Sequence, residues 1–152
     1  MMDVFVYGTL QIAMPYHHLC GRINQVKKAQ TWGRLYALSE GYPALELPSQ
    51  MIVGLGTCDY QNDANLCQVL LDSVVKPSGD WDCIHGELLN LNDPNQIERM
   101  DEFEDFSPNN ENSLYLRQLV PVLVGDEWAY VWAYHYNQVH DGRRIKSGCW
   151  KS

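Results

Sequence analysis

The sequence predicts an α+β fold, a small mixed β-barrel with a few flanking helices, and three observations lead to this class. The chain has 152 residues, the length of one ordinary domain, and 45% of it is apolar, which suffices for a buried core. Segments typical of strands are interrupted by only one or two segments typical of helices. Near the C-terminus, a predicted hairpin has apolar residues on both faces, as in a closed or strongly curled sheet.

The first half of the chain contains most of the short elements. Residues 4–7 predict a buried strand that ends at Gly8, and residues 17–20 predict a helical turn. Residues 28–38 predict a second strand, and residues 40–44 a turn. Residues 51–59 alternate apolar and small residues and predict a further strand.

The region from residue 46 to 82 is the least regular part of the chain, and we expect it to be an insertion in a single domain that spans residues 1–152. Its only helical pattern is one apolar face, formed by Leu66, Val69, Leu70 and Val74. After this region, residues 84–91 predict a strand. Residues 94–106 predict a helix, because Asn92 or Asp93 can cap it and Pro94 suits its first turn.

Residues 115–124 and 127–136 predict a hairpin whose turn, Gly125-Asp126, suits type II′. Counting back from that turn sets the register. The predicted pairs are Leu123 with Trp128, Pro121 with Tyr130, Leu119 with Trp132, Arg117 with Tyr134, and Tyr115 with Tyr136. One face is therefore bulky and aromatic, and the other is small and aliphatic. His135 falls on the small face, where a hydrogen-bonded core histidine is expected.

The predicted helix carries several acidic residues, of which only Glu104 lies on its apolar side. That side is formed by Ile97, Met100 and Phe103. Glu98 and Glu102 point to solvent, and Asp101 lies at the margin. A buried carboxylate must be paired or have a raised pKa, and a raised pKa suits general acid/base chemistry near neutral pH. Alternatively, Glu104 ends the helix and pairs with Arg117 or a tyrosine hydroxyl.

Tyr7, Gly8, Thr9 and Leu10 follow the first strand directly. A glycine at this point lets the backbone turn sharply and present successive N–H groups, which can bind a carboxylate or an oxyanion. The alternative is a simple strand-to-loop turn in which Thr9 caps its own backbone.

Three further residues are candidates for the same site. Tyr115 and Arg117 lie two apart on one strand face, so their side chains project together. Arg117 could hold a substrate carboxylate, position Glu104, or pack against Tyr134. Glu87 lies in an otherwise apolar strand, where it lines a pocket or faces solvent.

Composition excludes several classes of function. With 11 basic against 19 acidic residues the net charge is −8, which disfavours nucleic-acid binding. The apolar N-terminal stretch is too short for a signal peptide or a membrane span. Five cysteines without Cys-x-x-Cys spacing disfavour a disulfide framework or a zinc site, and His17-His18 lacks further ligands at suitable spacing. We therefore expect a cytoplasmic protein without a metal site, either monomeric or homodimeric.

Several motifs, in this order, resemble the γ-glutamyl cyclotransferase family. They are VFVYGTL, GRLYAL with GYPAL, HGELLNL, MDEFEDF, Tyr115-x-Arg117 and AYVWAYHY, covering the chain from Val4 to Tyr136. The tail RRIKSGCW is similar to a C-terminal stretch of some members. The resemblance implies that Glu104 is the catalytic acid/base, that Asp101 is the acid preceding it, and that residues 7–10 form the substrate-binding loop.

The resemblance also implies an activity: cyclisation of a γ-glutamyl amide to 5-oxoproline, with release of an amino acid or amine and without a cofactor. A γ-glutamylamine, a γ-glutamyl-carrier adduct, or mere γ-glutamyl binding on the same fold are the alternatives. The chain departs from the family pattern at Asp105, where a small residue is usual, and in the long loop that follows it. A charge at Asp105 is expected to raise the pKa of Glu104 further or to crowd the site, and residues 46–82 could cover it.

Overall fold

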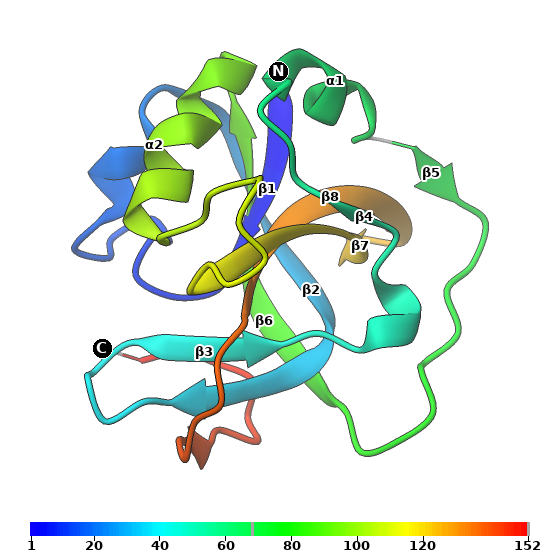
Figure 1. The fold of residues 1–152 in the computed structure, drawn as a ribbon. Helices are drawn as coiled ribbons and strands as arrows, with labels where there is room; N and C mark the ends of the chain where they lie inside the picture. The colour runs from blue at the N-terminus through cyan, green and yellow to red at the C-terminus, as the bar shows by residue number, and fades with distance from the viewer. Residues whose placement is uncertain (68, 152) are drawn as a thin grey trace.

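The computed structural model describes residues 1–67 and 69–151 of the chain (Figure 1). The strands are β1 (Met2–Val6), β2 (Ile23–Ala37), β3 (Pro43–Glu46), β4 (Gly54–Leu55), β5 (Leu70–Leu71), β6 (Asp82–Leu91), β7 (Tyr115–Val124), β8 (Glu127–Tyr136) and β9 (Arg143–Arg144). The helices are α1 (Tyr60–Asn65) and α2 (Ile97–Phe103). Single 3₁₀ turns are η1 (His17–Cys20), η2 (Ser49–Met51) and η3 (Pro94–Gln96).

Five strands close into a barrel in the order β2, β6, β1, β8 and β7, and β7 returns to β2 where Gln30 pairs with Leu123. The β1–β8 pair is parallel, whereas the other four neighbouring pairs are antiparallel, so the barrel is mixed. The remaining strands extend this ring at its edges. The predicted class, a small mixed barrel with a few short helices, is confirmed.

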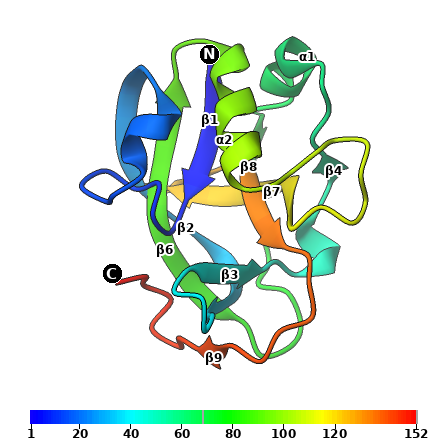
Figure 2. The same ribbon diagram turned by 60° about the vertical axis from the view of Figure 1, so that its left-hand side comes forward.

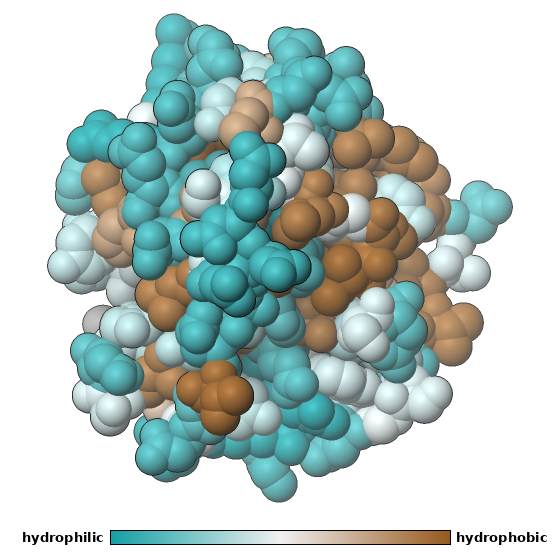
Figure 3. Space-filling model, in the orientation of Figure 1, coloured by the Kyte–Doolittle hydropathy of each residue, from teal (hydrophilic) through white to brown (hydrophobic). Residues whose placement is uncertain are grey.

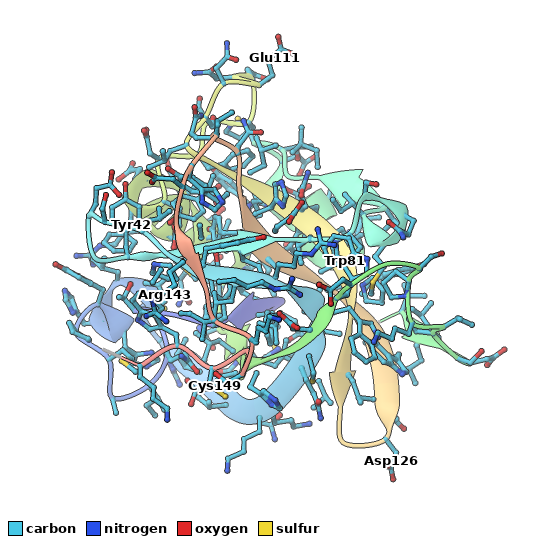
Figure 4. All side chains as sticks on the ribbon, turned by 90° about the horizontal axis from the view of Figure 1, so that it is seen from below. Tyr42, Trp81, Glu111, Asp126, Arg143 and Cys149 are labelled. Atoms are coloured by element: carbon cyan, nitrogen blue, oxygen red, sulfur yellow. The ribbon has the colours of Figure 1, made fainter. Side chains whose placement is uncertain are left out.

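The β7–β8 hairpin has the predicted register throughout, with all five expected cross-strand pairs. Its turn begins at Gly125, which has a φ of 62°, a conformation that costs glycine no steric strain. Figure 4 shows Asp126 at the tip of this hairpin, directed away from the barrel. His135 accepts a hydrogen bond from the Leu47 N–H at 3.0 Å, as expected of a satisfied core histidine.

Apolar clusters cover both faces of the hairpin, because the barrel interior lies on one side and the helices on the other. The small face contributes Val120, Val122, Val131 and Ala133 to the barrel interior. The bulky face contributes Tyr115, Leu119, Trp132 and Tyr134 to a second cluster, which also contains Ile97 and Met100 of α2. Helix α2 therefore packs across β1 and β8 from outside the barrel (Figure 2).

The expected helix over 94–106 begins as η3 and continues as α2. Asp93 caps it, accepting from the Asn95 N–H at 3.0 Å, while the Gln96 side chain accepts from the Asp93 N–H at 2.8 Å. The helix ends at Phe103, so Glu104 follows it instead of lying within it. The strand predicted over 28–38 begins earlier, at Ile23, and the turn at 40–44 leads into β3, which the pattern did not reveal.

Two predictions within residues 46–82 were wrong. The strand expected over 51–59 is only β4, preceded by η2, and its two residues pair with Leu119 and Gln118 of β7. The helix of this region is α1, whereas Val69 and Leu70 lie at β5, largely exposed. Periodicity failed here because these apolar side chains do not enter the core.

Apolar side chains gather on the face over β4 and β5, which includes Leu55, Val69 and Leu70 (Figure 3). Among the described residues, the helices are all too short to cross a membrane.

Candidate active site

A cavity of about 390 Å³ opens between the end of β1, the β2–β3 turn and the end of α2. Its lining residues are Phe5 to Leu10, Tyr16, Glu40 to Pro43, Phe103, Glu104, Leu114, Tyr115 and Tyr134. Tyr42 lies on the β2–β3 turn, at the edge of the molecule in Figure 4. Six of the eight predicted site residues line this one cavity: Glu104, the segment Tyr7 to Leu10, and Tyr115.

Glu104 is turned into this cavity by the way α2 ends. The Phe106 N–H donates to the Asp101 carbonyl at 2.8 Å, and the Asp105 N–H donates to the Glu102 carbonyl at 3.1 Å, which together form a Schellman motif. Asp105 occupies the left-handed position of this motif, with a φ of 52°. The chain therefore reverses directly after Glu104, and Phe106 packs into the core.

Glu104 is half-buried at the wall of the cavity, and its carboxyl has no hydrogen-bond partner in the described part of the chain. Burial, with a further contribution from the charge of Asp101, raises its pKa from 4.5 to about 8. Asp105 is exposed and is not among the causes of this shift, contrary to expectation. Near neutral pH such a carboxyl can both accept and donate a proton.

Residues of the loop after β1 line the same cavity. Gly8 lies so close to the β2–β3 turn that a Cβ atom there would be 2.6 Å from Pro43 Cγ. The N–H groups of Gly8, Thr9 and Leu10 find no acceptor within the described residues. Three successive free donors beside a buried carboxyl suit a ligand that has both an anionic and an amine group.

Tyrosines fix the walls around these donors. The Tyr7 hydroxyl donates to the Tyr134 carbonyl at 2.8 Å, and the Tyr115 hydroxyl donates to the Pro43 carbonyl. Burial raises the pKa of both hydroxyls, with Glu104 contributing, so they remain neutral donors. Tyr115 was predicted to face the site, and it does so while anchoring the β2–β3 turn.

Arg117 does not line the cavity, although it was predicted as a substrate-binding residue. Its guanidinium is fully buried and forms ion pairs with Asp101 and Asp63 at 2.9 Å each. The Tyr134 hydroxyl donates to the same Asp101 carboxylate at 2.7 Å. Since Asp63 comes from α1, the expected insertion supplies a counter-charge to the core. Arg117 thus holds α1, α2 and β7 together instead of contacting a ligand.

Glu87 also lies outside this cavity, contrary to prediction. Its carboxylate accepts from the Ile12 N–H at 2.6 Å, and it lines a separate, wider hollow beside Lys28 and Trp150. Its position on β6 is opposite Val6, the last residue of β1.

The sequence matches one family model over nearly its whole length. The profile described as "Gamma-glutamyl cyclotransferase, AIG2-like" matches residues 4–62 and residues 63–152. The chain belongs to this family. A search of curated protein sequences finds no significant match.

Solved structures show that the fold of this γ-glutamyl cyclotransferase family member is shared. YkqA from Bacillus subtilis is 23% identical with a TM-score of 0.61, and the match covers 98% of this chain but 39% of YkqA. An AIG2-like protein from Mus musculus is 21% identical with a TM-score of 0.54, covering 89% of this chain and 76% of the mouse protein. The protein PH0828 from Pyrococcus horikoshii is 20% identical with a TM-score of 0.52, covering 98% and 89% of the two chains.

Sequence reasoning missed several residues of this cavity. Glu40 and Tyr42 were read only as part of a turn, and Tyr16 was not considered as a wall residue. The GYPAL motif could have indicated that this turn belongs to the cavity, because it contains Tyr42 and Pro43. Within the described residues, His, Cys, Asp and Glu side chains form no group of three that could hold a metal ion.

Proposed function

We propose that this γ-glutamyl cyclotransferase family member cyclises a γ-glutamyl amide to 5-oxoproline and releases the amine, with Glu104 as general acid/base. The observation that carries the proposal is the unpaired carboxyl of Glu104 in the same cavity as three free backbone N–H groups. A half-buried carboxyl that has a raised pKa and no hydrogen-bond partner among the described residues favours a chemical role.

In the proposed reaction, the α-amine nitrogen of the substrate attacks its own γ-carbonyl carbon. A ring C–N bond forms, and the amine loses a proton to Glu104. The original amide C–N bond then breaks, and Glu104 returns the proton to the departing nitrogen. The atoms balance without water, because the amide rearranges into 5-oxoproline and a free amine. Holding the reacting atoms about 3 Å apart supplies much of the rate advantage.

The free N–H groups of Gly8, Thr9 and Leu10 are proposed to bind the α-carboxylate of the substrate or the oxyanion of the tetrahedral intermediate. Tyr7 and Tyr115 hold the loop and the opposite wall in place through their hydroxyls. The pKa of about 8 keeps Glu104 near the balance between accepting and donating a proton.

A γ-glutamylamine is a second candidate substrate, favoured by the charges at the cavity. The residues that line the cavity include Glu40 and Glu104 but no lysine, arginine or histidine. A leaving group with its own carboxylate would find no cation there, whereas a neutral or cationic amine would be tolerated.

The test is incubation of the parent protein with γ-glutamyl amides of amino acids and of simple amines, with detection of 5-oxoproline. We expect turnover by the parent and a loss of about a hundredfold or more in kcat for Glu104→Gln. Glu102→Gln is the matched control, since Glu102 lies on the same helix and is exposed. Equal turnover by all three proteins would reject the mechanism, and binding without turnover would indicate a non-catalytic binding module.

A further inference from the structure

The loop of residues 8–16, which contains the free donors of the cavity, uses its carbonyl groups in hydrogen bonds of its own. The Gly8 carbonyl accepts from the backbone N–H and the side-chain amide of Gln11, at 3.1 and 3.2 Å. The Thr9 carbonyl accepts from the Tyr16 N–H at 3.1 Å. These contacts shape the loop but do not attach it to the barrel.

Leu10 is buried in the core, and beyond it Glu87 attaches the loop to β6. Its Oε1 atom accepts from the Ile12 N–H at 2.6 Å, and a hydrogen bond to an ionised carboxylate is roughly twice as strong as a neutral one. Glu87 stands opposite Val6, from which the chain enters the loop. The same point of β6 therefore holds the start of the loop through the strand ladder and its middle through a side chain.

The Glu87 carboxylate forms no salt bridge among the described residues. Its cross-strand neighbour on β2 is Lys28, yet the salt bridges found in the described part of the chain do not include Glu87. Ile12 itself has an exposed side chain, so apolar packing contributes little to holding this part of the loop. This hydrogen bond restrains the loop at Ile12, between Leu10, which is buried in the core, and Tyr16, whose ring centroid lies 4.9 Å from that of Phe103.

We infer that Glu87 is a positioning residue for substrate binding: its carboxylate holds loop 8–16 so that the N–H groups of Gly8, Thr9 and Leu10 remain directed at the ligand. The inference rests on the proposed function and refines it. Glu87 does not touch the substrate, and Glu104 is untouched by its removal. Loss of Glu87 therefore weakens ground-state binding and leaves the chemical step in place.

The test compares Glu87→Ala and Glu87→Gln with the parent, and with Glu111→Gln as a control at the tip of a distant loop (Figure 4). For γ-glutamyl ethylamide, we expect KM to rise about tenfold in Glu87→Ala while kcat stays within about twofold. The KM of Glu87→Gln should lie between those of the parent and Glu87→Ala, because the glutamine amide oxygen can still accept from the Ile12 N–H. An unchanged KM in Glu87→Ala, or an equal loss of kcat, would overturn the inference.

Two measurements separate this inference from the proposed reaction. In a Glu104→Gln background, where chemistry is blocked, adding Glu87→Ala should raise the Kd for γ-glutamyl ethylamide by the same factor of about ten. Amide hydrogen exchange at Ile12 should become faster in Glu87→Ala, with exchange in β1 unchanged. If the parent neither binds nor converts the amide, the proposed function fails, and Ile12 exchange alone decides whether Glu87 holds the loop.

Discussion

Asp101 and Glu104 lie three residues apart at the end of one helix, but Asp101 is buried, whereas Glu104 is half-buried at the cavity, and their hydrogen-bond partners differ. Asp101 receives hydrogen bonds from Arg117 at 2.9 and 3.1 Å and from the Tyr134 hydroxyl at 2.7 Å. Glu104 receives none from the described residues. Burial raises the pKa of Asp101, whereas Arg117 and Tyr134 act to lower it. For Glu104 nothing opposes the effect of burial.

The comparison shows that partners, more than burial, separate a structural carboxylate from one available for chemistry. Asp101 and Asp63 neutralise Arg117 and join α1 and α2 to β7. Glu104 stays free because the Schellman motif directs it to the cavity side of the helix end, away from that cluster. The paired cluster thereby provides a rigid support for the unpaired group.

The largest effect is expected from removing the cation of the paired cluster. Arg117→Met leaves two buried aspartates without a counter-charge and should lower the free energy of unfolding by about 3–5 kcal/mol. Urea denaturation of the parent and of Arg117→Met measures this difference in the free energy of unfolding. Arg144→Met is the control, because Arg144 pairs with Asp80 and Asp82 at the surface and should change stability much less. Similar losses in both variants would contradict the stabilising role assigned to the buried Arg117 cluster.

The raised pKa of Glu104 should make the stability of the protein depend on pH. The pKa of Glu104 is about 8 in the folded protein and near 4.5 when unfolded, so the folded state binds more protons between these values. The free energy of unfolding, compared with that of Glu104→Gln, should therefore fall as pH rises from about 4.5 to 8, with a slope of up to about 1.4 kcal/mol per pH unit. Denaturation of both proteins across this pH range measures the difference, and parallel curves would show that Glu104 is paired or solvated.

A smaller effect is expected from the influence of the Asp101 charge on the pKa of Glu104. Asp101→Asn removes the charge that adds to the raised pKa of Glu104, so that pKa should decrease. The pH profile of kcat/KM for a γ-glutamyl amide should then shift to lower pH by about half a unit. Glu98→Gln, on the same helix but exposed, should leave the profile in place. A profile unchanged in Asp101→Asn would mean that burial alone sets the pKa.

Local pattern predicted the regular parts of the molecule well. The β7–β8 register followed from one turn and the two-residue period of a strand, and β6 and the capped start of the acidic helix followed from equally local signals. The inward direction of Glu104 was predicted from helical period, although the helix ends one residue earlier and the following turn contributes to the outcome. Such features are set by neighbours within a few residues.

Arg117 and Glu87 were assigned to the wrong surroundings, since strand alternation gives the face of a side chain but not the segment that covers it. Only barrel closure brings Asp63 from α1 over Arg117, and Ile12 from the first loop over Glu87. The sequence by itself determined most of the barrel strands, the hairpin, the acidic helix and the glycine turn, because short-range sterics and period dictate them. The tertiary structure decided which carboxylates have partners, because pairing joins residues that are distant along the chain.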